Sequence, residues 1–551
     1  MPSNRLFSTP GKFGVNAAEL RIKSGQAKNS DQEPLELFAA SLVAGGMVSQ
    51  FDPADIDPSQ LTLATNCTIR DSVTARRPGN NLITPTAPDI SPVLGFFDYK
   101  DPIGVVTLIR ITNNANPIKI KGAAVWTTIV GAALNIDVNA QVQVVIAGTF
   151  LGLATQKDRL QQINLTTNTY AAAGNALKYK YWCSHNNRII GFNLYDAATP
   201  APIQLGTSGQ FNPTEWNPSV DPSAAIFQIE DSLSSFSDFG TGIVPFGDYL
   251  LVIRERSLWL GSIQASATIP YYFTNAIPTM GCDTPKSIQQ TPSGVCYYDR
   301  RLRNVFEYDL GKSLPIPIGD VIRTELRQMI TNPDLVFSSY DASNDEYILG
   351  VPIGSSNVVR RWRYNRKSKA WSFDDIQNLT ALSALNYPSN SITIDDLIGT
   401  IDNLLGTIDG LSPASDIASF FTGYNNGDLA IEDVNSDTDR GLVFNLDLRS
   451  KLFQLPANAN YVAQLHITYI PIRAGGFTVY YSKDGGQTFI TYKSITYDNS
   501  TLGKRLSIVC NKNIRNRAYM WKVTQNTGIC DFVEYEAYAF TTAGYTRQKS
   551  G

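Results

Sequence analysis

The chain has 551 residues, of which 43% are hydrophobic and 17% charged, and its formal net charge is −3. This length predicts about two to four domains, and the apolar content is enough for sizeable cores. The balanced charge argues against a protein that grips nucleic acid through an extensive basic surface. Aromatic residues, at 11% and mostly Tyr and Phe, favour strands over helices.

The chain opens with a polar segment, residues 1–43, which we interpret as an extended N-terminal arm. Ser24–Pro34 is predicted to be disordered or to order only against a partner, whereas Leu35–Val43 fits a short helix or strand. The first residues lack the apolar region of a secretory signal, so we expect a protein that reaches its destination without a standard export signal. The longest apolar stretch, near Val144–Ala154, is too short to span a membrane.

From about residue 90, short apolar runs alternate with turns that contain Gly, Asp, Asn and Pro, which is the pattern of consecutive β-hairpins. In Thr241–Gly319, for example, the run Tyr249–Ile253 precedes the polar turn Arg254–Arg256 and the run Ser257–Leu260. Such units recur about every 40 to 50 residues, which is the spacing of propeller blades. We therefore predict an all-β fold with a β-propeller of roughly five to seven blades over residues 44–435.

Residues 391–411 interrupt this rhythm, because Thr-Ile-Asp recurs there with a period of seven, starting at positions 393, 400 and 407. The segment is interpreted as an insertion that either docks a neighbouring protein or covers a blade. Calcium binding by Asp395, Asp402 and Asp409 is a further alternative.

Residues 436–551 carry alternating apolar strands about 10 to 15 residues apart, which predicts a β-sandwich-like C-terminal domain. Within it, Ser482–Phe489 matches the Asp-box pattern S-x-D-x-G-x-T-F. The physics of this pattern is structural, because its Asp accepts turn hydrogen bonds and its Gly permits a positive φ.

Several pieces of the chain occur in an order that a known family shares. The first has a Gly-Gly start, an Asp-Pro turn, a Gln-Leu pair, an Asn-bearing strand and an Arg-Pro-Gly close, at Gly45, Gly46, Asp52, Gln60, Leu61, Asn66, Arg77, Pro78 and Gly79. Further pieces follow at Gly247–Ile253, Gly281-Cys282, Gly294-Val295, Tyr340–Tyr347, Val351-Pro352, Lys369–Trp371 and Thr422–Leu429. Over Gly45–Asp433 this order resembles the β-propeller proteins of short-tailed bacteriophages, namely tail nozzle or tail tubular proteins and related head-to-tail stabilising rings.

The resemblance implies a structural virion protein that forms a ring-shaped nozzle or tube segment and gates and conducts DNA during ejection. It implies a homo-hexamer in the phage tail, made in the host cytoplasm and bound to an adaptor or connector protein, with tail fibre or needle proteins nearby. Genomic DNA would pass through the lumen without sequence-specific binding. The alternative is a glycan-binding or glycan-degrading propeller, such as a tailspike or sialidase-like protein, which the single Asp-box supports.

No catalytic residue, cofactor site or metal site is predicted, and we expect a protein that is not an enzyme. None of the six cysteines forms a CxxC pair, and the two histidines, His185 and His466, lie far apart in the sequence. The cysteines are interpreted as buried free thiols, with a disulfide Cys282–Cys296 or Cys510–Cys530 as the alternative.

Two basic runs, Arg360–Lys369 and Arg300–Arg303, are the remaining candidates for a functional surface. The first contains Trp362 and Tyr364, so it is either a nucleic-acid patch or a charged hairpin between two strands. The adjacent carboxylates Asp374 and Asp375 would point to opposite faces of a strand, so they do not form a glycosidase pair.

Overall fold

The structure is a computed structural model. It describes residues 36–83, 90–100, 106–114, 116–121, 125–137, 140–195, 200–230, 238–266, 268–329, 333–352, 359–376, 378–385, 419–454, 460–514 and 518–542. These residues form strands almost throughout. The helical exceptions are short: α2 (Arg323–Met329), η1 (Pro285–Ser287), η2 (Asp320–Ile322), η3 (Pro333–Leu335) and η7 (Asn499–Thr501).

Five four-stranded antiparallel sheets follow one another in chain order, and in each of them consecutive strands pair. Their strands are β6 (Val93–Lys100), β7 (Val106–Thr112), β8 (Ile118–Lys121) and β9 (Thr127–Thr128); β10 (Gln143–Ala147), β11 (Phe150–Ala154), β12 (Gln161–Asn164) and β13 (Thr169–Ala172); β14 (Tyr179–His185), β15 (Arg188–Leu194), β16 (Ala201–Thr207) and β17 (Ala225–Gln228); β18 (Gly240–Phe246), β19 (Tyr249–Arg254), β20 (Leu258–Ile263) and β21 (Tyr271–Ile277); and β22 (Gln289–Gln290), β23 (Gly294–Asp299), β24 (Asn304–Asp309) and β25 (Ile316–Pro317).

A sixth sheet is built from two distant parts of the chain. It contains β30 (Leu379–Leu385), β31 (Ser419–Tyr424), β32 (Leu429–Asp433), β5 (Gly79–Leu82), β33 (Thr438–Asp439) and β34 (Leu442–Val443). The early strand β5 pairs antiparallel with β32, from Gly79 opposite Asp433 to Leu82 opposite Ala430. This pairing closes the ring, because it joins the start of the propeller to its last blade.

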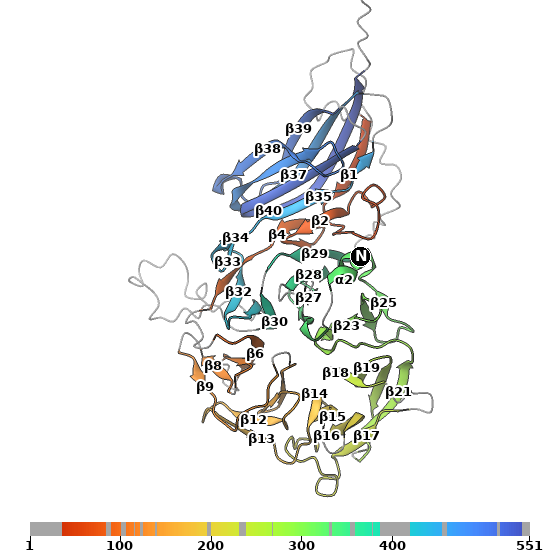
Figure 1. The fold of residues 1–551 in the computed structure, drawn as a ribbon, viewed down its shortest axis with the longest axis vertical. Coiled ribbons are helices and arrows are strands. Elements are labelled where there is room, and N and C mark those ends of the chain that lie inside the picture. Colours follow the sequence, from red (N-terminus) through yellow and green to blue (C-terminus); the bar gives the residue numbers. More distant parts are fainter. Residues whose placement is uncertain are drawn as a thin grey trace, which may run out of the picture.

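The remaining four-stranded unit consists of β26 (Phe337–Asp341), β27 (Glu346–Pro352), β28 (Val359–Asn365) and β29 (Ala370–Asp374). It stands between the β22–β25 sheet and the β30 sheet, since β26 contacts both β22 and β30. Six separate blades and this unit therefore surround one axis, with the first strand of each unit innermost (Figure 1). The predicted propeller of five to seven blades is confirmed.

Hydrophobic cores lie between neighbouring blades. One such core joins Tyr181, Phe192 and Leu205 of the β14–β17 blade to Leu250 and Trp259 of the next blade. The apolar residues of each strand therefore serve both faces of the sheet, which explains why the sequence shows continuous apolar runs here rather than strict alternation.

The β26–β29 unit continues into a 14-stranded sheet in the order β26-β27-β28-β29-β2-β35-β40-β37-β38. Its other strands are β1 (Glu36–Leu42), β2 (Leu61–Thr65), β3 (Cys67–Arg70), β4 (Val73–Arg76), β35 (Leu446–Ser450), β36 (Phe453–Gln454), β37 (Asn460–Ser482), β38 (Ile490–Tyr497), β39 (Leu506–Ile514) and β40 (Ala518–Thr542). Figure 1 shows this C-terminal sheet standing over one side of the blade ring.

The two long strands β37 and β40 pair along their whole length and bend together, with register shifts between Pro471 and Phe477. At the bend, Gly528 has a φ of +71° and a Cβ there would lie 2.5 Å from the Ala474 carbonyl oxygen. The two halves fold toward each other, so that the Trp521 and Tyr535 rings meet with centroids 5.0 Å apart. The predicted sandwich-like domain is thus one sheet folded over its own core.

The end of the predicted arm, β1, pairs with β40. Residues 1–35 and the repeat at 391–411, with Asp395, Asp402 and Asp409, lie outside the described residues. β2 and the β3–β4 hairpin belong to the 14-stranded sheet rather than to a blade. All six cysteines are buried and free, which confirms the prediction of buried thiols. Among the described residues, no helix is long and apolar enough to cross a membrane.

Candidate functional site

A buried group of charges lies where the propeller meets the C-terminal sheet, and we call it the seam. Its centre is Asp374, at the end of β29, whose Oδ2 accepts hydrogen bonds from Arg361 Nε and Arg363 Nε, both at 2.7 Å. Arg77 Nε lies 3.3 Å from the other oxygen, Oδ1. The side chains of Arg77, Arg361 and Asp374 are 0% exposed.

Two further acids complete the seam. Glu346 of β27 lies 3.1 Å from Arg363 Nη1, and Glu432 of β32 lies 2.8 Å from Arg361 Nη2 and also pairs with Arg363. Arg77 reaches outward, where its Nη1 donates to Asp439 at 2.8 Å. Arg361 and Arg363 share one face because side chains two apart on a strand point the same way.

The charges of the seam hold one another ionised. Burial alone would raise the pKa of the Asp374 carboxyl, but the charges of Arg363, Arg361 and Arg77 outweigh it and lower the pKa to about 2. Burial also opposes ionisation of Glu432, yet Arg363 and Arg361 lower its pKa. Glu346 differs, because burial dominates and raises its pKa. The seam therefore joins blades and sheet through ionised groups at neutral pH.

This arrangement settles the role of most of the first basic run. Arg361 and Arg363 point into the seam, and Asn365–Lys369 forms the turn between β28 and β29, as the hairpin alternative predicted. A nucleic-acid patch at Arg361 and Arg363 is wrong, because neither guanidinium reaches the surface of the chain. The second run, Arg300–Arg303, is an exposed turn in which Arg300 Nε pairs with Asp283 at 3.0 Å.

Residues that carry the family resemblance gather at the same seam. The Asn66 side chain accepts from the Asp375 backbone N–H at 3.0 Å and donates to the Asn445 carbonyl at 2.8 Å. Gly46 has a φ of +73°, and a Cβ there would lie 2.6 Å from the Trp371 backbone nitrogen. The structure of the seam therefore explains why Asn stands at position 66 and Gly at position 46.

The Asp-box forms a tight turn between β37 and β38. Asp484 Oδ1 accepts from Ser482 Oγ at 2.7 Å and from the Thr488 N–H at 2.9 Å, and Thr488 Oγ1 donates to Oδ2. These hydrogen bonds, first of all that from the Thr488 side chain, lower the pKa of Asp484 to about 2. The carboxylate thus stabilises its own turn.

The two histidines and the carboxylate pair are accounted for by local contacts. His185 Nδ1 lies 2.9 Å from Tyr271 Oη and Nε2 lies 2.7 Å from the Gly247 carbonyl oxygen, so the ring links two blades. His466 lies 3.8 Å from Glu536. Asp374 is buried while Asp375 is exposed, as predicted for adjacent strand positions. Within the described part of the chain, no group of three His, Cys, Asp or Glu residues could hold a metal ion.

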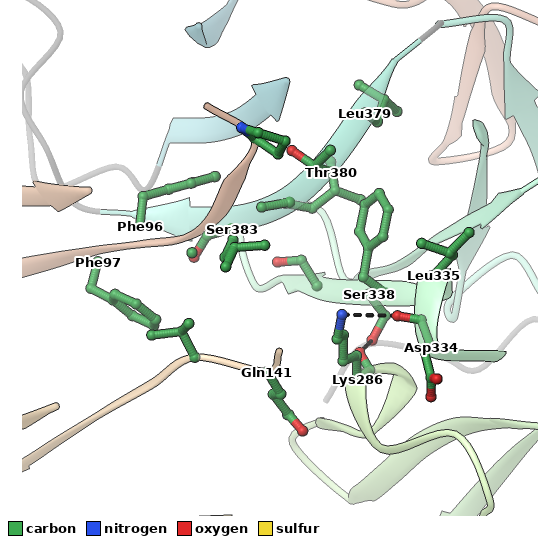
Figure 2. A pocket seen from close by; sticks show the side chains of 18 of the residues that line it. Phe96, Phe97, Gln141, Lys286, Asp334, Leu335, Ser338, Leu379, Thr380 and Ser383 are labelled. Carbon is green, nitrogen blue, oxygen red and sulfur yellow. Dashed lines mark hydrogen bonds between the residues drawn. The ribbon is translucent and has the colours of Figure 1, made fainter. Parts of the chain in front are cut away.

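A cavity of about 530 Å³ lies between inner strands of the propeller, and we call it the axial cavity. The inner strands β6, β26 and β30 line it together with residues just before β10 and around η1. Apolar side chains such as Phe97 and Leu379 lie beside hydroxyls such as Ser338 and Thr380 (Figure 2). Cavities of this size and mixed lining are typical of small-molecule sites.

One lysine gives the cavity its chemistry. Lys286, in η1, donates from Nζ to the Asp334 carbonyl oxygen at 2.8 Å (Figure 2). Among the described residues it has no carboxylate within ion-pair distance. Burial lowers the pKa of Lys286 to about 8, and the nearby Asp334 charge only partly offsets this effect. Lys286 is half-buried, so its ammonium is partly desolvated and poorly paired.

The outermost strands of neighbouring blades present large apolar side chains, and we call this surface the rim. Ile226 on β17 is 49% exposed, Tyr272 on β21 is 63% exposed and Ile316 on β25 is 46% exposed. On the closing sheet, Leu442 and Val443 of β34 are 71% and 64% exposed. Each of these strands also ends its sheet, so one backbone edge lacks a strand partner among the described residues.

Sequence analysis missed both the axial cavity and the ionic role of the seam. The cavity is assembled from five separate units, and Lys286 stands in an ordinary polar loop sequence, so no local signal marks it. The seam did leave a signal, because Arg361 and Arg363 alternate with Trp362 and Tyr364 on a predicted strand.

Comparison with known proteins adds little to this geometry. No protein-family model and no curated protein matches the chain. One similar solved structure is the extracellular domain of the hybrid two component system BT4673 of B. thetaiotaomicron, with 12% identity over 76% of this chain and a TM-score of 0.38. The chain spans 47% of that protein's length. Another is YCF48 bound to D1 peptide, with 9% identity, 65% of this chain and 99% of that chain covered, and a TM-score of 0.35.

Proposed function

We propose that the protein is a structural component of the tail of a short-tailed bacteriophage, where copies assemble into a ring around the DNA path. The observation that carries the proposal is the rim, in which the last strands of three successive blades, β17, β21 and β25, each expose a large apolar side chain. Ile226, Tyr272 and Ile316 stand on the last strands of three neighbouring blades. Single exposed apolar residues are ordinary, but repetition along one rim is typical of a surface that packs against another protein.

The size of the axial cavity supports a DNA path that lies outside the single subunit. A volume of about 530 Å³ suits a small molecule and cannot admit a nucleic-acid duplex. A channel for DNA therefore has to be formed between copies, which agrees with the homo-hexamer that the sequence resemblance implies. The net charge of −3 supports the same reading, because a lumen rich in Lys and Arg would bind phosphates and retard transit.

The stiffness of the subunit also supports a mechanical role. β5 closes the ring of blades, and the β26–β29 unit joins the C-terminal sheet where Phe373 of β29 pairs with Thr65 of β2 and Ser372 Oγ donates to the Cys67 carbonyl oxygen. Contacts of this kind resist hinge motion between the propeller and the C-terminal sheet. A tube segment under DNA pressure requires such resistance. The adaptor or connector, the fibre or needle proteins and the virion location follow from the same proposal.

The decisive experiment removes the chain from the particle. Virions assembled without it should leak or lose their DNA and fail to infect, which quantitative infection and packaged-DNA assays would measure. Particles with normal DNA content and normal infectivity would contradict the proposal.

A second experiment tests the rim directly. Tyr272→Glu places a charge on the outer strand and should shift purified protein from rings to single subunits, as seen by electron microscopy and sedimentation. Tyr249→Glu is the matched control, because Tyr249 is 42% exposed in the same blade but lies on its second strand, β19. Rings that persist in Tyr272→Glu would remove the rim from the interface.

The glycan alternative can be tested on the same protein. A glycan-degrading propeller would release new reducing ends from host polysaccharide, whereas a structural tail protein would leave the polysaccharide intact. We expect no release, and robust release would overturn the structural proposal.

A further inference from the structure

We propose that the axial cavity is a binding site for a small amphipathic carboxylate, whose carboxylate pairs with Lys286 and whose hydrocarbon part lies against the apolar wall. This inference is independent of the proposed function, since it concerns the interior of a single subunit.

Lys286 has hydrogen-bonding capacity that the described residues leave unused. An ammonium has three donors and no acceptor. One of them is used by the Asp334 carbonyl oxygen at 2.8 Å. Since no acid lies within ion-pair distance of Lys286 among the described residues, a carboxylate in the cavity would supply both a counter-charge and an acceptor.

The backbone that carries Lys286 is held in place before any ligand arrives. Its carbonyl oxygen accepts from Ser338 Oγ at 3.0 Å, and Gln289 Nε2 donates to the Ser338 carbonyl at 3.0 Å. The next carbonyl, that of Ser287, accepts from the buried Tyr347 hydroxyl at 2.8 Å. A positioned cation loses little conformational entropy when it binds an anion.

The wall of the cavity combines apolar side chains with a few polar groups. Apolar side chains make up much of the lining, from Leu94, Phe96, Phe97, Leu335, Phe337 and Leu382. Thr380 and Gln141 also line it, and the side-chain oxygens Thr380 Oγ1 and Gln141 Oε1 are buried without a hydrogen-bond partner among the described residues. A ligand with a short apolar body and one additional polar group would fit this lining.

Charge defines the class of ligand. Lys286 and Asp334 are the charged side chains among the described lining residues, and Asp334 is exposed to solvent. A cationic ligand would be repelled by Lys286, and a polyphosphate would require several cationic groups. A ligand with a single negative charge matches the single ammonium. The lowered pKa of Lys286 agrees with this, because an anion would stabilise the charged form that burial disfavours.

The experiment compares an acid with its neutral isostere. Isothermal titration of the full chain with 4-phenylbutyrate should show saturable binding, and 4-phenylbutanamide should bind about tenfold more weakly because it lacks the charge. Lys286→Met should reduce affinity for the acid to that of the amide. Lys312→Met is the matched control, since Lys312 is exposed on the turn before β25 and should leave binding unchanged.

The comparison of acid and amide uses the unaltered chain, so it stands even if Lys286→Met fails to fold. Equal binding of acid and amide would overturn the proposal, as would the absence of saturable binding by the acid at millimolar concentration. Unchanged binding of the acid by folded Lys286→Met would overturn it as well.

Discussion

The seam removes its ionisable groups from water completely and the axial cavity does so in part, and the two regions compensate the charges differently. In the seam, three arginines surround Asp374, and Glu346 and Glu432 pair with two of them. In the cavity, Lys286 has one backbone carbonyl and no carboxylate within ion-pair distance among the described residues. The pKa of Asp374 falls to about 2, which preserves its charge, whereas that of Lys286 falls to about 8, which makes its charge easier to lose.

This difference separates groups that hold the fold from a group that is available to a ligand. A buried charge with several partners is expensive to alter, because its partners are left unpaired. A buried charge with few partners already destabilises the free protein, so its removal should cost little. The following predictions test this distinction by comparing substitutions in the two regions.

Asp374→Asn should produce the largest loss of stability. The neutral amide cannot compensate the positive charges of Arg77, Arg361 and Arg363, so the free energy of unfolding should fall by about 3–5 kcal/mol. Asp375→Asn is the matched control on the next residue, which is exposed, and should change it by less than about 0.5 kcal/mol. Urea unfolding followed by tryptophan fluorescence measures both. Equal effects of the two variants would show that the seam is not stabilised by its charges.

Acid should produce the second-largest loss of stability, because it weakens the seam. The folded pKa of Asp374 lies below its ordinary value of 3.8, so its contribution is present above that pH and is lost as pH falls toward 2. The loss amounts to about 2 kcal/mol. Glu432 acts in the same direction, whereas the raised pKa of Glu346 opposes it.

The measurement is the difference in unfolding free energy between the unaltered chain and Asp374→Asn at pH 5 and pH 3. This difference isolates one carboxyl from the others that titrate in the same range. It should shrink at the lower pH, and a constant difference would argue that Asp374 has an ordinary pKa.

Glycine substitutions test the packing of the seam apart from its charge. Gly46 and Gly148 have φ values of +73° and +59°, so alanine is strained at both. A Cβ at Gly46 would also lie 2.6 Å from the Trp371 nitrogen, whereas none of the surrounding atoms comes within 4 Å at Gly148. Gly46→Ala should therefore lower the free energy of unfolding by at least about 1 kcal/mol more than Gly148→Ala does. Equal losses of stability in the two variants would mean that the packing around Gly46 adjusts to accommodate the added methyl group.

Local sequence patterns were sufficient for the blades and insufficient for the way the ring closes. Tyr249–Ile253 and Ser257–Leu260 were identified as hairpin strands because β-branched and aromatic runs between turn residues encode them directly. The closing strand β5 has the sequence GNNL, which carries no strand signal, and its partner β32 lies about 350 residues away in the chain. Its position is fixed by pairing and by the neighbouring Arg77, which are tertiary effects.

The candidate site shows the same limit more strongly. Arg361 and Arg363 could be assigned to one face of a strand from their spacing, but not to a buried seam, since Glu346, Asp374 and Glu432 come from other strands. Lys286 faces a cavity because five units converge on the axis. A pattern along one strand does not contain that convergence, and the sequence therefore predicts blades without predicting what their axis binds.

Lys286→Met should have the smallest effect on stability and thereby sharpens the contrast with Asp374. The substitution removes an ammonium that burial disfavours and retains the apolar stem, so replacement by a hydrophobic side chain of similar length should be close to neutral. We expect the free energy of unfolding at pH 7 to change by less than about 1 kcal/mol, measured beside Asp374→Asn under the same conditions. A loss as large as that of Asp374→Asn would mean that Lys286 is part of the framework of the fold, and the distinction between a structural seam and a ligand-ready cavity would fail.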